Sequence, residues 1–214
     1  MIAVPSAGTG ITIDAGSSDA VTLKRLSLWG SAGNGVAIQA NSAATVVLED
    51  CDSRNVQYGA SLMSTSTAFT VVGGVYEGSD TSLFIRAGSN KVAIDSVKIY
   101  GTSSNAAVDA VGNDVTVTRS LLSGSGTTGF NPGIWVKGGS TVVLEYDVIS
   151  GYGPGVQVGG GLSGNGVVFL SNNTIANNRT GVTVTTGTGL TRGNNTIAAN
   201  STNVSGILTA FRAN

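Results

Sequence analysis

Residues 21–40 read VTLKRLSLWGSAGNGVAIQA, and this stretch decides the fold. Apolar side chains alternate with polar ones at Val21 and Leu23 and again at Val36 and Ile38, which is the two-residue period of a β-strand. A Gly-Asn-Gly turn separates the two halves. The stretch therefore predicts two or three short strands joined by tight turns, with the apolar side chains directed to one face.

The same pattern returns every 22 to 27 residues along the chain. We place the first apolar residue of the successive copies at Val21, Val46, Phe69, Val92, Val115, Val142, Val168 and Leu190. A unit of this length cannot bury its apolar face alone and is typical of a solenoid, in which each copy packs on the next. The repeat predicts an all-β fold, a right-handed parallel β-helix (solenoid) of about eight to nine coils, with residues 1–214 as a single domain.

Composition fits a chain of strands and turns and excludes several classes of protein. Glycine accounts for 32 of the 214 residues and charged residues for only 11 %, less than half the usual fraction of about 25 %. The formal charge is −1 and no basic stripe occurs, which argues against a nucleic-acid partner. No apolar run reaches the length of a membrane span, and the first residues lack the pattern of a signal peptide.

Histidine and cysteine limit the chemistry that the chain can perform. Histidine is absent, which excludes the Ser-His-Asp triad, the Cys-His pair and most zinc sites. Cys51 is the only cysteine, so it has no partner for an internal disulfide. Its place in the repeat matches Leu26 and Val97, and we expect a buried thiol that acts as a small apolar side chain.

The densest acidic cluster consists of Glu49, Asp50 and Asp52, with Glu77 in the next copy. Carboxylates this close could hold Ca²⁺. Basic residues at the equivalent positions of neighbouring copies instead favour ion pairs across adjacent strands. The expected pairs are Lys24 with Glu49, Arg25 with Asp50, and Arg54 with Glu77. We therefore favour surface ion pairs over a calcium site and expect no cofactor.

The run from Gly10 to Ala40 and the segments NNTIANN (172–178) and NNTIAAN (194–200) carry a resemblance. They resemble the right-handed β-helix repeat proteins of bacteria, within the pectate-lyase-like fold superfamily. The resemblance implies a β-helix and a location outside the cell, at the cell surface or in the periplasm. Such proteins usually carry an N-terminal segment that caps the coil. The chain begins within the coil, so we expect that cap to be missing and an uncapped coil able to pair end to end with another copy.

Two asparagine pairs occur at the same position of late copies, Asn172 with Asn173 and Asn194 with Asn195. Asparagine tolerates the left-handed backbone conformation and bonds its own backbone in turns. We expect these side chains to stack on one another in a turn between strands.

The outward positions of the second strand of each copy form two expected columns. The first column is Ala37, Ser61, Phe84, Ala107, Trp135, Gln157 and Thr183. The second column is Gln39, Met63, Arg86, Asp109, Lys137, Gly159 and Thr185. In this register Phe84, Arg86, Asp109, Trp135 and Lys137 share one exposed patch. A loop over residues 127–132 carries Phe130, which we expect to lie beside Trp135 and to wall a groove.

The patch allows more than one interpretation. The simpler one is an ordinary solvent-facing ladder of charge pairs and cation–π contacts. The functional one is an aromatic platform that accepts a sugar ring or a partner protein, which predicts a non-catalytic module that binds a polysaccharide or a cell-surface protein. A polysaccharide lyase or glycoside hydrolase acting on acidic polysaccharide is an alternative, with Arg86, Lys137 and Asp109 as its acid and base set but no residue assigned as catalytic. A structural, self-assembling scaffold is a further alternative.

Overall fold

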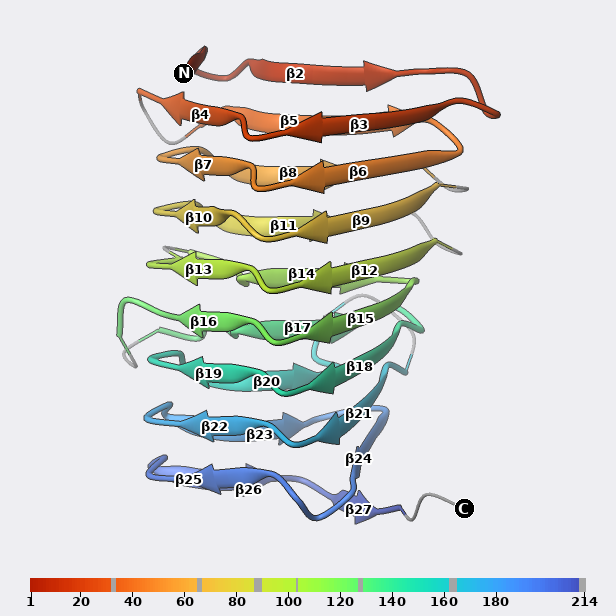
Figure 1. Ribbon diagram of the computed structural model, residues 1–214. Helices are drawn as coiled ribbons and strands as arrows, with labels where there is room; N and C mark the ends of the chain where they lie inside the picture. Colours follow the sequence, from red (N-terminus) through yellow and green to blue (C-terminus); the bar gives the residue numbers. More distant parts are fainter. Residues whose placement is uncertain are drawn as a thin grey trace.

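The computed structural model describes residues 1–31, 34–64, 67–86, 90–102, 104–126, 129–161 and 165–211. Within these ranges the regular structure consists of β-strands, stacked into the tall coil of Figure 1 with the two termini at opposite ends. No helix that is long and apolar enough to cross a membrane occurs in the described ranges. The prediction of an all-β right-handed parallel β-helix is confirmed.

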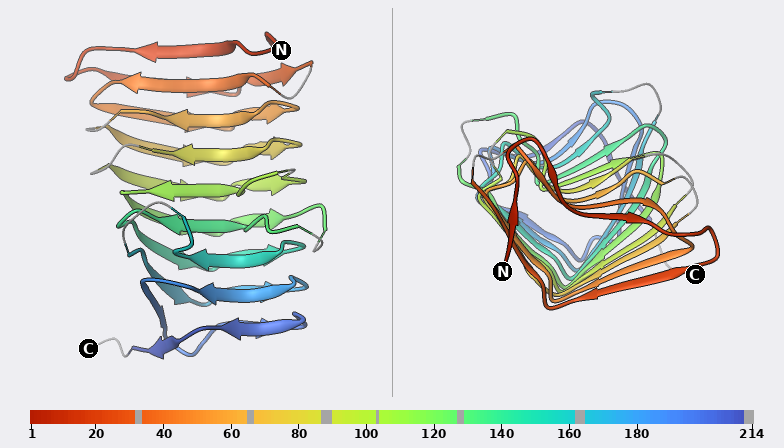
Figure 2. Two further views of the ribbon diagram at one scale, coloured as in Figure 1. Left: turned by 180° about the vertical axis from the view of Figure 1, so that it is seen from behind. Right: turned by 90° about the horizontal axis from the view of Figure 1, so that it is seen from above.

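Each coil contributes one strand to each of three nine-stranded parallel sheets. Sheet A contains β1 (Ile2–Val4), β4 (Ser27–Gly30), β7 (Asp52–Arg54), β10 (Val75–Glu77), β13 (Lys98–Tyr100), β16 (Leu121–Ser123), β19 (Val148–Ser150), β22 (Thr174–Ala176) and β25 (Thr196–Ala198). Sheet B contains β2 (Thr9–Asp14), β5 (Val36–Ser42), β8 (Tyr58–Leu62), β11 (Thr81–Ile85), β14 (Val108–Val111), β17 (Ile134–Lys137), β20 (Pro154–Val158), β23 (Thr180–Val184) and β26 (Thr202–Ser205). Sheet C contains β3 (Ala20–Lys24), β6 (Thr45–Glu49), β9 (Ala68–Val72), β12 (Lys91–Asp95), β15 (Asp114–Thr118), β18 (Thr141–Glu145), β21 (Val167–Ser171), β24 (Thr188–Thr191) and β27 (Leu208–Ala210). Figure 2 shows the same stack from behind and along its axis, with the three sheets around the interior.

Sheet C contains the apolar column from which the repeat was recognised. The strand pairing places Val21, Val46, Phe69, Val92, Val115, Val142 and Val168 opposite one another in that order. All but Val21 are buried, and removing side chains of this size from water stabilises a fold by about 1.5–3 kcal/mol each. The last predicted copy was placed one residue too late. Val168 pairs with Gly189, and Leu190 pairs with Phe169 on the outward face.

The start of each sheet B strand is a corner where a side chain points inward toward sheet A. A Cβ atom on Gly133 would lie 2.8 Å from Ile149 Cγ2, and one on Gly155 would lie 2.8 Å from Ile175 Cγ2, so only a small residue fits. Ala37 and Ala107 occupy corners of this kind, and neither side chain is exposed. Placing these two alanines in an outward column was therefore wrong, because strict alternation does not continue through the corner.

The turns between sheets C and A are held by stacked polar side chains. The backbone N–H of Asn172 donates to Asn194 Oδ1 at 3.1 Å, and that of Asn173 donates to Asn195 Oδ1 at 2.9 Å. The predicted stacking of these asparagines is confirmed. Asn172 has a φ of 57°, the left-handed conformation that asparagine tolerates better than most residues.

Surface ion pairs join neighbouring coils as predicted at two of the three expected places. Lys24 Nζ lies 2.6 Å from Glu49 Oε2, and Arg54 Nη1 lies 3.2 Å from Glu77 Oε2. In the described part of the chain no ion pair joins the third expected couple, Arg25 and Asp50. Exposed pairs of this kind contribute about 0–1 kcal/mol each to the free energy of unfolding, so they stabilise the coil only slightly.

Candidate functional site

The outward face of sheet B carries most of the predicted patch, on the neighbouring strands β11, β14 and β17 (Figure 1). The strand pairing places Phe84 between Ser61 and Asp109, and it places Trp135 between Asp109 and Gln157. Asp109 therefore lies in one column with Phe84 and Trp135. It does not lie in the neighbouring column, where the predicted register had placed it.

The neighbouring column contains Arg86 and Lys137, with Val111 at the level where Asp109 was expected. Val111 pairs with Lys137, and Arg86 follows the pair of Ile85 with Ala110. The predicted register is thus two residues off on β14, which keeps Asp109 on its predicted outward face but changes its neighbours. The segments that lead into the sheet B strands differ in length, so counting from the turns does not fix the register.

Lys137, Asp109 and Trp135 form a closely packed group that we call the sheet B cluster. Lys137 Nζ lies 2.8 Å from Asp109 Oδ2 and 3.7 Å from the centre of the Trp135 ring. Trp135 Nε1 donates to the carbonyl of Gly159 at 2.8 Å. Lys137 is 8 % exposed and Asp109 only 1 %. The two charges neutralise each other inside the protein, and they hold the indole in one orientation.

The electrostatics of Asp109 follow from its position under neighbouring side chains. Burial raises the pKa of the Asp109 carboxyl, although the hydrogen bond and the positive charge of Lys137 oppose the rise. Among the described residues, Oδ1 of Asp109 has no hydrogen-bond partner. Lys137 stabilises the ionised carboxylate most, and Asn105 and the charge of Arg86 contribute less.

Phe84 and Arg86 form the more open half of the predicted patch. The Phe84 ring stacks on the Tyr58 ring with 4.7 Å between centroids and 18° between planes. The guanidinium carbon of Arg86 lies 5.6 Å from the Phe84 centroid, and the Arg86 side chain is exposed. Arg86 is therefore a charged group on this face that solvent or a ligand reaches directly.

Phe130 contacts a residue outside the sheet B cluster. Its side chain is 78 % exposed, and the guanidinium carbon of Arg179 lies 4.5 Å from its ring centroid. Arg179 precedes β23, two coils beyond β17. Residues 127 and 128 of the predicted loop lie outside the described residues. That Phe130 walls a groove beside Trp135 therefore stays a prediction.

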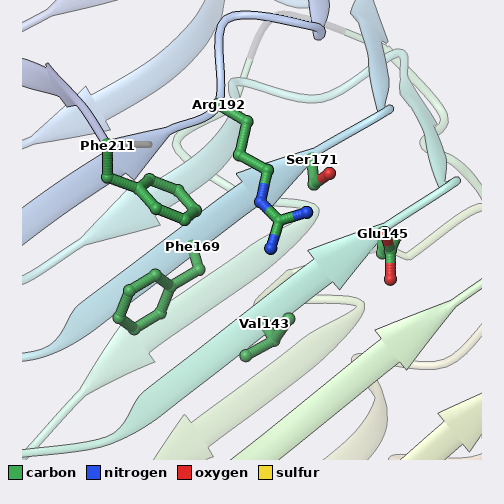
Figure 3. A pocket seen from close by; sticks show the side chains of 6 residues that line it. All are labelled: Val143, Glu145, Phe169, Ser171, Arg192 and Phe211. Carbon is green, nitrogen blue, oxygen red and sulfur yellow. The ribbon is translucent and has the colours of Figure 1, made fainter. Parts of the chain in front are cut away.

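A pocket on the outward face of sheet C was not anticipated from the sequence. It encloses about 240 Å³ and is lined by Val143, Glu145, Phe169, Ser171, Arg192 and Phe211 (Figure 3). The rings of Phe169 and Phe211 meet edge to face with centroids 5.5 Å apart, and Arg192 lies 5.5 Å from the Phe211 ring. The one signal in the sequence was Phe169 at an outward position between the inward Val168 and Leu170.

One family model matches the chain, over residues 10–210, which include nearly all of the three sheets. That family is described as the periplasmic copper-binding protein NosD. The chain belongs to the NosD family. The comparisons with curated proteins and with solved structures found no match.

The copper in the NosD description has no evident ligands in this chain. Copper sites use imidazole, thiolate or thioether groups, and the sequence contains no histidine, one cysteine and two methionines. Cys51 is 1 % exposed, as predicted, and burial raises the pKa of its thiol, which disfavours the thiolate that binds metal. Within the described ranges, no group of three or more His, Cys, Asp or Glu residues is arranged to hold a metal ion. The residues present thus do not fit a copper centre.

Proposed function

We propose that the protein is a non-catalytic binding module of the periplasm or cell surface, and that a polysaccharide lies across the outward face of sheet B. The observation that carries this proposal is the order of Phe84, Asp109 and Trp135 on three successive strands. Two aromatic side chains are thereby separated by about two strand spacings, or about 9.6 Å, along the coil axis. Aromatic side chains with a few fixed polar groups are typical of ligand sites, and a chain-like ligand fits a face that repeats along one axis.

The rings are already held in position before any ligand binds. Trp135 is fixed by Lys137 and by its hydrogen bond to Gly159, and Phe84 is fixed by Tyr58. A rigid side chain loses little conformational entropy on binding, so more of the contact energy contributes to affinity. The exposed Arg86 adds a positive charge beside Phe84, which favours acidic over neutral polysaccharides.

Catalysis by the same face has weaker support. A general base must reach the proton that it removes, directly or through one water. Lys137 and Asp109 are bonded to each other and almost without exposure, which leaves Arg86 as the accessible member of the predicted acid and base set. This arrangement favours a binding role over that of a lyase or hydrolase.

A glycan array with three proteins tests the proposal. We expect the wild type to bind acidic oligosaccharides and Trp135→Ala to lose that binding. Trp29→Ala is the matched control, because Trp29 lies on sheet A, is 43 % exposed and also contacts an arginine, Arg54, at 5.8 Å. Binding that survives in Trp135→Ala, or no binding by the wild type, contradicts the proposal.

Self-association is a second candidate, because apolar side chains of the last coil are exposed. Ile207 is 77 % and Val204 is 36 % exposed, and parallel strands accept a further strand at a sheet edge. If copies pair end to end, the mass measured by light scattering rises with protein concentration. Ile207→Lys is expected to reduce that rise, and a concentration-independent monomer mass for the wild type contradicts the candidate.

A further inference from the structure

The pocket on sheet C combines an apolar floor with an arginine at its rim. Val143 and Phe169 lie next to each other on β18 and β21, and Phe211 follows β27 at the far end of the sheet. In Figure 3 the guanidinium group of Arg192 points down into the pocket between the two phenylalanine rings and the side chains of Ser171 and Glu145. The pocket therefore offers rings on one side and polar groups on the other.

Glu145 and Arg192, the two charged residues of the pocket, differ in their ion pairing from other charged residues near the C-terminal ends of the sheet C strands. Glu49 is paired with Lys24 and Asp95 with Arg119, each at 2.6 Å. In the described part of the chain, neither Glu145 nor Arg192 takes part in an ion pair.

Strand pairing explains the difference. Lys24 and Glu49 face each other directly on adjacent strands, whereas Ser171 faces Glu145 and so lies between Glu145 and Arg192. The guanidinium group is thus left without a carboxylate, next to an apolar surface.

We propose that this pocket binds a small monocarboxylate with an apolar or aromatic body. The carboxylate pairs with Arg192, whose planar fork of N–H donors matches a carboxylate in two parallel hydrogen bonds. The body of the ligand packs on Phe169 and Val143, with Phe211 along its edge. This site lies on a different sheet from the proposed polysaccharide face and does not depend on that proposal.

Size and charge narrow the ligand class further. Pockets for drug-sized ligands enclose about 300–1,000 Å³, so a volume near 240 Å³ suits a molecule of one ring or one branched alkyl group. Glu145 places a negative charge on the opposite side of the pocket from the rings. Glu145 repels any carboxylate in the pocket, but a carboxylate paired with Arg192 gains a compensating attraction that a second carboxylate on the ligand lacks.

Binding of 3-phenylpropionate, followed by ligand-observed NMR and calorimetry, tests the site. We expect the wild type to bind it, and Arg192→Gln to bind it at least about tenfold more weakly, as expected for the loss of a charged hydrogen bond. We also expect the neutral amide 3-phenylpropanamide to bind the wild type at least about tenfold more weakly than the acid does. Arg179→Gln is the matched control, because Arg179 makes the same type of contact with Phe130 elsewhere on the surface.

Two outcomes overturn the inference: no binding of 3-phenylpropionate by the wild type, or equal affinities of wild type and Arg192→Gln. Equal affinities for the acid and the amide also overturn it, because the apolar surface alone then explains the binding. Glu145→Gln provides a separate test, since removing the negative charge should strengthen binding of the acid severalfold and leave the amide unchanged. Arg192 is exposed, so its substitution leaves the fold intact, which unchanged thermal unfolding verifies.

Discussion

Asn173 Oδ1 accepts the backbone N–H of Asp147 at 2.9 Å, and Asp147 repeats this contact one coil earlier by accepting the N–H of Ser120 at 2.8 Å. The two side chains differ in what else they can do. Asn173 Nδ2 donates to the carbonyl of Leu144 at 2.9 Å, whereas Oδ2 of Asp147 is buried without a hydrogen-bond partner in the described structure. Burial, with the nearby charges of Asp95 and Glu145, raises the pKa of Asp147 to about 7.

The first prediction is that Asp147 makes the protein less stable as the pH rises toward neutrality. Its folded-state pKa of about 7 exceeds the ordinary value of 3.8, so the folded protein retains a proton that the unfolded chain releases. The free energy of unfolding therefore falls between about pH 4 and pH 7 and is level above that. Asp147→Asn should remove this fall and stabilise the protein by a few kcal/mol above pH 7. Thermal unfolding of both proteins from pH 4 to pH 9 measures it, and parallel profiles would show that Asp147 does not titrate in this range.

The second prediction concerns the sheet B cluster. Lys137→Met leaves Asp109 buried without its counter-charge, which should cost about 3–5 kcal/mol of unfolding free energy. The double variant Lys137→Met/Asp109→Leu removes both charges and should recover most of that loss. Urea unfolding of the wild type, Lys137→Met, Asp109→Leu and the double variant completes a mutant cycle. Additive losses would mean that the two charges do not depend on each other.

The third prediction tests the assignment of inward and outward faces on sheet C. Val117 is fully buried, so Val117→Asp places an uncompensated charge in the core and should cost several kcal/mol or unfold the protein. Thr116→Asp is the control, since the neighbouring Thr116 is exposed and faces outward, and it should stay within about 0.5 kcal/mol of the wild type. Similar melting temperatures for both variants would be incompatible with the burial alternation of β15.

The fourth prediction concerns the copper named in the family description. With Cys51 buried and no histidine in the chain, folded wild type and Cys51→Ala should compete equally poorly with a chelator for Cu(I). The absorbance of the chelator complex reports the competition directly. One equivalent of copper retained by the folded wild type and lost in Cys51→Ala would contradict the argument from the ligands.

The sequence predicts the fold well where the spacing between copies is regular. The pairs Lys24–Glu49 and Arg54–Glu77 follow from such spacing alone, because equivalent residues of adjacent coils face each other. The register on sheet B was harder to predict, since the segment before β14 has no fixed length and Ala107 turns inward at the corner. The alternation of apolar and polar residues predicts neither the length of this segment nor the inward turn at Ala107.

The pocket on sheet C could not be predicted from the repeat, for a different reason. Its rings come from Phe169 in one coil and Phe211 after the last strand, where the periodic pattern has ended. A residue outside the repeat has no equivalent position in the neighbouring coil, so its contacts depend on the three-dimensional path of the chain. The raised pKa of Asp147 could not be predicted either, because the sequence does not show which carboxylate oxygen lacks a hydrogen-bond donor in the folded protein.

Because β12 and β15 pair in unbroken register, the molecule can be shortened or lengthened by one complete coil at a time. Val92 and Val115 occupy the same place in successive coils, so excising residues 92–114 would join Lys91 to Val115 with the cross-section unchanged. That excision would also remove Asp109 and bring Phe84 directly against Trp135, halving the separation of the two rings from about 9.6 Å to about 4.8 Å. Gain or loss of a coil could therefore change the spacing of the two rings while both rings are kept, although loss of this coil would leave Lys137 without Asp109.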